Sequence, residues 1–88
     1  MNKGRKLNTT QLECFVSLAS TLNFAKTAEQ VYLTQPAVTK EIQSLESELS
    51  AKLFIRTTRS VSLTDVGRQF LPEANSILNS YYHAKDWI

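Results

Sequence analysis

The sequence contains few cysteine, histidine, glycine and proline residues, and these low numbers exclude several kinds of protein site. Its 88 residues include one cysteine, one histidine, two glycines and two prolines. The single Cys14 excludes an internal disulfide and a cysteine-rich metal site, and we expect a reducing, intracellular setting. Two glycines cannot form a glycine-rich phosphate loop. Because no nucleophile–base pair or metal-ligand cluster can be assembled, we predict that the chain is not an enzyme and needs no cofactor or metal.

Long hydrophobic runs are also missing. The apolar stretches are far shorter than a bilayer span, so we expect no transmembrane helix. The basic residues near the N-terminus are followed by polar residues 8–11 instead of the apolar segment of a signal peptide. Hydrophobic residues make up 42% and charged residues 20% of the chain, which is typical of one globular domain. We therefore expect a single cytoplasmic domain.

Positive charge is concentrated in the N-terminal part of the chain. The net charge of +2 is too small by itself to indicate a nucleic-acid partner. Residues 1–40 hold five basic and two acidic side chains, whereas residues 41–88 hold five basic and six acidic ones. Residues 1–6 contain three of the basic side chains, and we predict a flexible basic arm there that adds salt-dependent affinity for a polyanion.

Capping residues and apolar spacing predict two helices in the first third of the chain. Thr10 and Glu13 have the spacing of a capping box, which places the start of the first helix at Thr10. Its apolar face would consist of Leu12, Phe15, Val16 and Ala19. Asn23 is the expected N-cap of a short second helix over residues 24–31.

The third predicted helix has two faces of different character. Thr34 is its expected N-cap, and Pro36 falls in the first turn, where a missing N–H costs nothing. The apolar face would consist of Val38, Ile42, Leu45 and Leu49. The opposite face is polar or cationic, and residues 34–40 contain no acid.

The last part of the chain predicts a hairpin and a long helix. Two short β-prone runs, 53–56 and 61–63, flank a polar tip without glycine or asparagine, which favours a hairpin with no tight primed turn. Thr64 is expected to cap a helix that runs to the end of the chain, with a bend or irregularity at Pro72. Its heptad seam consists of Phe70, Ala74, Ile77, Tyr81, Ala84 and Ile88. We expect this seam to be a dimer interface, because the small domain offers little surface to cover it.

Two helices joined by a short turn, the second with a polar outward face, indicate a helix-turn-helix. The N-terminal residues of a helix lying in the major groove of DNA reach the base edges. The Gln35 amide can pair with adenine and the Lys40 ammonium can donate to guanine, while Thr39 and Pro36 can contact a thymine methyl group. These four residues are the expected base contacts.

The hairpin tip would supply a second contact with DNA. An arginine at the tip can enter a narrow minor groove, and hydroxyl groups suit phosphates. Arg56 is interpreted as a phosphate contact or as a structural ion-pair partner. The expected DNA-backbone and minor-groove residues are Thr34, Gln43, Arg56, Thr57, Thr58 and Arg59.

Several segments together resemble the DNA-binding domain of LysR-type bacterial transcriptional regulators. They are Asn23-Phe-Ala-Lys-Thr-Ala-Glu-Gln-Val31, Thr34-Gln-Pro-Ala-Val-Thr-Lys40, Ile42-Gln-Ser-Leu-Glu46, Leu49, Leu53-Phe54, Arg56-Thr57, Arg59 and Leu63-Thr64-Asp65-Val66-Gly67. The resemblance covers about residues 7–80. It implies a mainly α fold: a winged helix-turn-helix with a three-helix core and a small β-hairpin wing at 7–63, then a linker helix at 64–88. It also implies homodimers that bind interrupted palindromic promoter DNA.

The resemblance carries functional positions onto this chain. The family's base-contacting positions fall on Gln35, Pro36, Thr39 and Lys40, and its minor-groove arginine falls on Arg59. Thr39-Lys40 replaces the commoner Ser-Arg, which keeps a hydroxyl and a charge but loses the bidentate fork of arginine. Ser50 stands where a glycine usually follows the recognition helix. The effector-binding domain of the family is absent, so a small-molecule effector would act only through a domain outside this chain, which is a fragment or a stand-alone protein.

Two other interpretations compete with DNA binding. In one, the polar face of the third helix is only the solvated surface of a small helical domain. In the other, the winged helix holds a protein partner and the long helix recruits a different chain. Sequence-specific binding of duplex DNA and the mass of the particle in solution distinguish these interpretations.

Overall fold

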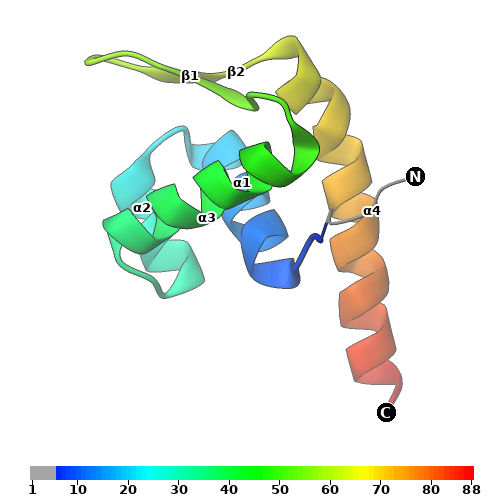
Figure 1. Cartoon of the computed structure of the whole chain (residues 1–88). Coiled ribbons are helices and arrows are strands. Elements are labelled where there is room, and N and C mark those ends of the chain that lie inside the picture. The colour runs from blue at the N-terminus through cyan, green and yellow to red at the C-terminus, as the bar shows by residue number, and fades with distance from the viewer. Residues whose placement is uncertain (1–5) are drawn as a thin grey trace.

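The structure is a computed structural model that describes residues 6–88. The elements follow one another as α1 (Thr9–Thr21), α2 (Phe24–Val31), α3 (Gln35–Leu49), β1 (Phe54–Arg56), β2 (Val61–Leu63) and α4 (Asp65–Trp87), as Figure 1 shows. Most of the predicted basic arm therefore lies outside the described residues. Lys6 lies within them, and its backbone N–H donates a hydrogen bond to Glu48 Oε2 at 2.9 Å.

Helix α1 begins earlier than the sequence predicted. Its N-cap is Asn8, whose side chain accepts a hydrogen bond from the Gln11 backbone N–H at 2.8 Å. The Gln11 side chain in turn accepts one from the Asn8 backbone N–H at 3.0 Å. The predicted capping box of Thr10 and Glu13 is therefore wrong. Asparagine ranks above threonine as an N-cap, and glutamine completes the reciprocal pair as glutamate would.

The N-caps of the other helices are those that the sequence predicted. Asn23, Thr34 and Thr64 each have an extended backbone, and each side chain accepts a hydrogen bond from the N–H three residues later. Pro36 lies in the first turn of α3. These caps satisfy backbone donors that a helix start would otherwise leave unpaired, which fixes where each helix begins.

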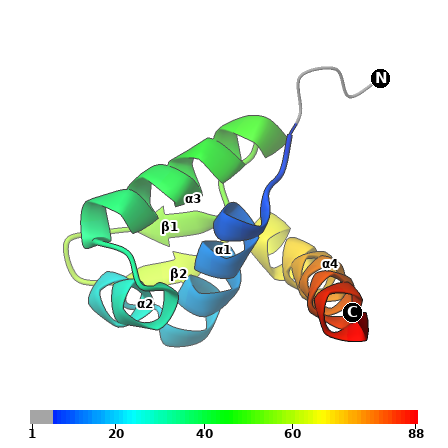
Figure 2. The same cartoon turned by 90° about the horizontal axis from the view of Figure 1, so that it is seen from below.

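The core lies among α1, α3, the root of the hairpin and α4. Phe15 of α1 is fully buried, and its ring centroid lies 5.6 Å from that of Phe54 and 5.3 Å from that of Phe70. Helix α3 contributes Val38, Ile42 and Leu45, all fully buried. Leu49, the fourth residue of the predicted apolar face, is half-buried. Figure 2 shows α1 between α2 and α3, with α4 along its other side.

The two strands form an antiparallel hairpin, here called the wing (residues 54–63). Phe54 pairs with Leu63, and Arg56 pairs with Val61. At its tip, the Thr57 N–H donates to the Ser60 carbonyl oxygen at 2.9 Å, and the Thr57 hydroxyl accepts from the backbone N–H of Ser60 at 3.0 Å. The threonine side chain thus closes a tip that has no glycine or asparagine. In both views the tip lies at the end of the molecule where α3 begins (Figures 1 and 2).

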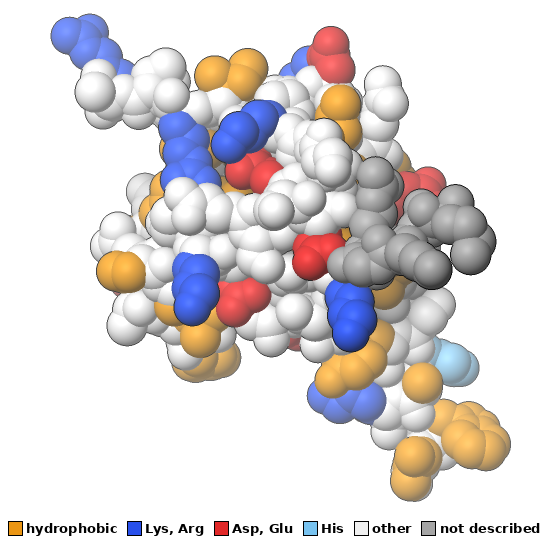
Figure 3. Space-filling model, in the orientation of Figure 1, with side chains coloured by type: hydrophobic (Ala, Val, Ile, Leu, Met, Phe, Trp, Pro, Cys, Tyr) orange, Lys and Arg blue, Asp and Glu red, His pale blue; other side chains and the backbone are white. Residues whose placement is uncertain are grey.

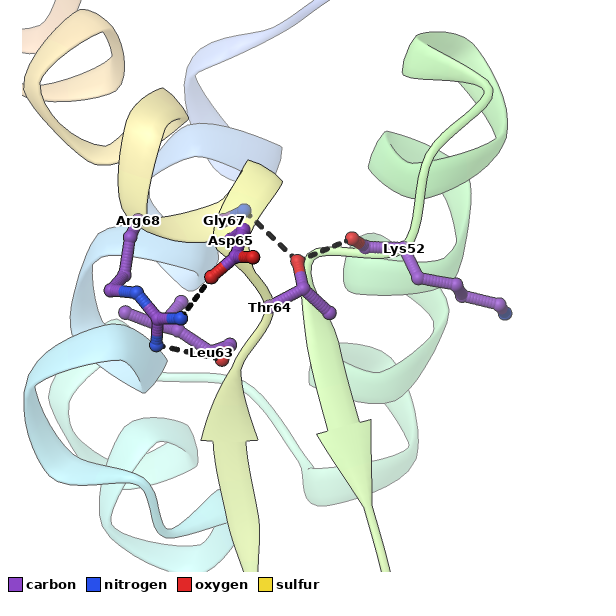
Figure 4. A network of polar contacts seen from close by, with 6 residues as sticks. All are labelled: Lys52, Leu63, Thr64, Asp65, Gly67 and Arg68. Atoms are coloured by element: carbon purple, nitrogen blue, oxygen red, sulfur yellow. Dashed lines mark hydrogen bonds and ion pairs between the residues drawn. The ribbon is translucent and has the colours of Figure 1, made fainter.

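A network of polar contacts joins the root of the wing to the start of α4 (Figure 4). The Thr64 hydroxyl donates to the Lys52 carbonyl oxygen at 2.6 Å and accepts from the Gly67 N–H at 3.0 Å. The Thr64 backbone N–H donates to the Leu53 carbonyl oxygen at 3.0 Å. Arg68 donates to the Leu63 carbonyl oxygen at 3.2 Å. The direction of α4 is therefore tied to the base of the wing.

Some apolar residues of helix α4 are buried in the core of the domain, and others are exposed to solvent. Ala74 is fully buried, Leu78 is nearly so, and Phe70 contacts Phe15. The prediction that Ala74 lies in a dimer interface is therefore wrong, because its side chain is fully buried within the chain. Phe70 is half-buried, and its place in an interface stays a prediction. The exposed large hydrophobic residues of the helix beyond Pro72 are Ile77, Tyr81, Tyr82 and Trp87. The helix also continues through Pro72 without interruption. Within residues 6–88, no helix is long and apolar enough to cross a membrane.

Candidate nucleic-acid interface

The N-terminal turn of α3 presents polar side chains to solvent. The Thr34 hydroxyl accepts a hydrogen bond from the Ala37 N–H at 3.2 Å, which fixes the start of the helix. Gln35, Pro36 and Lys40 are exposed, and Thr39 is half-buried. The first turn holds no acid, so nothing there offsets the partial positive charge of a helix N-terminus. This turn can therefore donate to anionic or hydrogen-bond-accepting groups of a ligand.

A buried polar cluster holds α2 against α1 and thereby fixes the helix-turn-helix. Thr27 is fully buried, and its hydroxyl lies 2.8 Å from that of Thr21 and 3.4 Å from that of Ser17. The turn to α3 begins at Tyr32, which has the left-handed φ of 59°. The next N–H, that of Leu33, donates back to the Ala28 carbonyl oxygen at 3.0 Å. Sequence reasoning did not identify this hydroxyl cluster.

The wing tip and the start of α3 border the same shallow hollow. Gln35 of α3, Asn23 and Phe24 at the start of α2, and wing residues 57–61 line it together. Arg59 is among these wing residues and is exposed. The structure therefore brings the predicted base-contacting Gln35 and the predicted minor-groove Arg59 to one face of the molecule, although 24 positions separate them in the sequence.

Other predicted contact residues lie along the same side of α3. Gln43 lines a second depression together with Lys52, Phe54 and Arg56. Thr57 and Thr58 are exposed at the wing tip, but the Thr57 hydroxyl is already engaged in closing the turn. Figure 3 shows a basic side chain at the projecting end of the wing and hydrophobic side chains at the far end of α4. The predicted DNA contacts and the exposed end of α4 are thus at different ends of the molecule.

Glu46 is a buried carboxylate, which the sequence analysis named only as part of the segment Ile42–Glu46 that carries the family resemblance. Its Oε2 accepts hydrogen bonds from the backbone N–H groups of Leu53 at 2.8 Å and Phe54 at 3.3 Å. Its Oε1 lies 3.9 Å from Lys52 Nζ. The side chain is 7% exposed, so the carboxylate fixes the wing root to α3. Its place next to the buried Leu45 was the available signal in the sequence.

Arg56 contacts an aromatic ring within the domain. Its guanidinium carbon lies 4.8 Å from the centroid of the Phe24 ring, which is the geometry of a cation–π interaction. The described part of the chain contains no ion pair of Arg56, so the structural ion pair considered from the sequence is not formed there. The side chain joins the wing to the start of α2.

The single cysteine and the acidic residues form no chemical site in the described residues. Burial, and after it the negative charges of Glu41 and Glu13, raises the pKa of the Cys14 thiol to about 11. The thiol therefore stays protonated at neutral pH and fills space in the core. Among residues 6–88, no group of three or more histidine, cysteine or acidic residues could hold a metal ion.

Comparison with known protein families identifies similar sequences. The family described as bacterial regulatory helix-turn-helix protein, lysR family, matches residues 9–68. The HTH-type transcriptional regulator CitR of Bacillus subtilis is 50% identical over 70 residues, which cover 80% of this chain and 24% of CitR. This chain spans about a quarter of the length of CitR and of YxjO from the same organism, which is 43% identical.

Solved structures show the same architecture. The CbnR DNA-binding domain in complex with DNA superposes with a TM-score of 0.85 at 32% identity, and the match covers 91% of this chain and 92% of that one. Oxidized OxyR of Corynebacterium glutamicum has a TM-score of 0.89 at 32% identity, covering 94% of this chain and 27% of OxyR. The mainly helical winged helix-turn-helix predicted from the sequence is thereby confirmed.

Proposed function

Because the chain belongs to the LysR family of bacterial helix-turn-helix regulators, we propose that it binds specific sequences in double-stranded promoter DNA. The observation that carries the proposal is that one face of the molecule joins the acid-free N-terminal turn of α3 to the wing tip, through the hollow bordered by Gln35 and Arg59. The DNA-bound CbnR domain, similar over nearly its whole length, supports it.

The proposed roles follow from the chemistry of each side chain. Gln35 and Lys40 read base edges in the major groove, and Pro36 and Thr39 contact thymine methyl groups. Arg59 enters the adjacent minor groove, where the negative potential attracts a cation. The proposed contacts with the DNA backbone are Thr34, Gln43, Arg56, Thr57 and Thr58.

The assembly proposed for the whole regulator is a homodimer in the cytoplasm. Four members of the predicted seam are exposed at the end of α4, namely Ile77, Tyr81, Ala84 and Ile88. Pairing of these residues with a second copy would set two recognition helices in successive major grooves. A small-molecule effector would bind a further domain, and the chain itself would catalyse no reaction.

The experiment that tests DNA binding begins with selection of bound duplexes from a random-sequence pool. The Kd for a selected and for a scrambled duplex is then measured over a salt series. We expect the Gln35→Ala, Lys40→Ala double variant to bind the selected and the scrambled duplex with similar Kd values, because contacts with the bases determine sequence specificity. Arg59→Ala should weaken binding to both duplexes, and Ser76→Ala on α4 should change neither value.

One outcome would contradict the assignment of the recognition face. If the Gln35→Ala, Lys40→Ala double variant distinguished the selected from the scrambled duplex as well as the parent, other residues would read the sequence. If the parent bound no duplex preferentially, the chain would instead act through protein partners. Light scattering with and without duplex tests the homodimer, and Ile77→Glu should lower the measured mass toward that of a monomer while His83→Glu should not.

A further inference from the structure

We infer that Arg56 is a positioning residue, whose contact with the ring of Phe24 sets the place of the wing relative to the recognition helix. This inference rests on the proposed DNA binding and goes beyond it. Arg59 and Gln35 can contact one duplex together only if the distance between wing and α3 is fixed. Near the tip, the contact between Arg56 and Phe24 adds to the packing of Val61, the pairing partner of Arg56, against the core.

The wing needs such a contact because its own structure is small. Each strand has three residues, and an isolated two-stranded hairpin of this size is marginally stable in water. The root is held by the buried Phe54 and by Glu46. Residues 55–60 are all exposed, so in the outer part of the wing core packing is supplied only by the half-buried Val61 of β2.

The ring beneath Arg56 is itself packed against the core, at the capped start of α2. Phe24 is the first residue of α2 and packs against the core. The preceding Asn23 caps the helix by accepting a hydrogen bond from the Lys26 N–H at 2.9 Å. A guanidinium 4.8 Å from the centroid of this ring is well within the range of a cation–π contact. Arg56 therefore ties the exposed part of the wing to the capped start of α2 in the helix-turn-helix.

Because Arg56 adjoins the turn of the hairpin, its contact with Phe24 also fixes the position of the wing tip. Arg56 is the last residue of β1 and pairs with Val61, the first residue of β2. The four residues between them form a turn that is closed by hydrogen bonds between Thr57 and Ser60. Fixing Arg56 therefore fixes the tip that carries Arg59, and Phe24 itself lines the hollow between that tip and Gln35.

A residue that only contacts phosphate would behave differently. Removing one phosphate contact lowers the slope of log Kd against log salt concentration by about 0.9 and does not depend on Phe24. A positioning contact predicts that Phe24 variants also weaken specific binding, although Phe24 carries no charge. It also predicts that the loss of Arg56 and the loss of Phe24 are not additive.

The test is a double-mutant cycle with Phe24→Leu and Arg56→Met, measured with the duplex selected by the parent chain over a salt series. We expect Phe24→Leu to raise Kd about two- to five-fold without changing the salt slope. The double variant should bind no more weakly than Arg56→Met alone. Phe24→Tyr, which keeps the ring, should retain the affinity of the parent. As a control cycle, Phe24→Leu is combined with Lys26→Met, which removes an exposed charge of the same helix. The effects of these two substitutions on log Kd should be additive.

NMR of the free chain gives a second measurement that does not need DNA. The ring should displace the Arg56 Nε–Hε signal in the parent and in Phe24→Tyr, and this displacement should vanish in Phe24→Leu. Additive losses in the cycle, or an undisplaced Arg56 signal in the folded parent, would overturn the inference while leaving the proposed function intact. Absence of any sequence preference in the parent would contradict the proposed function, and the inference with it.

Discussion

The hydroxyl of Tyr82 donates a hydrogen bond to Oε2 of Glu13 at 2.5 Å, across 69 positions of sequence. Glu13 lies in α1 and Tyr82 in the C-terminal half of α4, so the bond joins the linker helix to the body of the domain. The hydrogen bond to Glu13, and after it burial and the charge of that carboxylate, raises the pKa of Tyr82 to about 12.

Substitution of Glu13 by glutamine should lower the pKa of Tyr82 toward its ordinary value of about 10, because the charged acceptor is lost. A raised pKa in the folded state stabilises the fold below the unfolded-state pKa, and this contribution disappears as pH rises through about 12. The NMR signal of the phenol carbon of Tyr82, followed against pH, measures the change. A pKa of Tyr82 that is the same in Glu13→Gln as in the parent would contradict the bond.

Removal of the Glu46 side chain should destabilise the domain through the wing root. Glu46→Ala leaves the N–H groups of Leu53 and Phe54 without the partner they have now, and each such buried group costs about 1–3 kcal/mol. Glu46→Gln keeps one acceptor oxygen and should cost less. Urea unfolding of both variants measures the difference. Equal stability of Glu46→Ala and the parent would show that water replaces the carboxylate at no cost.

Gly67 should not tolerate a side chain. A Cβ atom at this position would lie 2.3 Å from the Leu53 carbonyl oxygen and 2.9 Å from Leu63 Cδ2. Because the first neighbour is backbone, Gly67→Ala should destabilise the fold by about 1–3 kcal/mol despite the better helix propensity of alanine. The melting temperature of this variant is compared with that of Ser80→Ala, an exposed position of α4. A Gly67→Ala variant as stable as Ser80→Ala would contradict the close packing.

Ser50 adopts the left-handed conformation, with φ 53° and ψ 40°, at the C-cap of α3. Glycine has no steric cost there, so Ser50→Gly should stabilise the domain by about 0.5–1 kcal/mol. The same change at the exposed Ser47, within the helix, should destabilise it by a similar amount. If Ser50 has the left-handed conformation, thermal unfolding should show melting temperatures shifted in opposite directions for the two variants. Shifts of the same sign would refute the strain at Ser50.

Local sequence signals predicted most of the elements. The caps Asn23, Thr34 and Thr64 were found because their side chains act on backbone groups three residues away, and such signals are visible in the sequence. The start of α1 was misplaced because two capping pairs overlap there. Asn8 with Gln11 competes with Thr10 and Glu13, and spacing alone does not rank them. Glu13 is instead engaged by Tyr82, a contact that no local pattern contains.

The less predictable features depend on tertiary contacts. The heptad spacing is present in α4, but Ala74 is buried and Phe70 contacts Phe15 of α1. Only the fold decides which part of an apolar row is buried. The roles of Glu46 and Arg56 depend in the same way on residues distant in sequence, namely the wing root and Phe24. Exposure of Gln35 and Lys40 followed directly from the polar face of one helix and was confirmed.

The length of α4 has a mechanical consequence. A helix of 23 residues is about 35 Å long, and its fixed end is held at Thr64 beside the wing root. Ala74 and Leu78 are buried, and Tyr82 is hydrogen-bonded to Glu13 of α1, so the helix is held against the domain from Thr64 as far as Tyr82. Domain and helix therefore turn as one unit, and a rotation of about 10° about the wing root would displace Trp87 by about 6 Å over such a length.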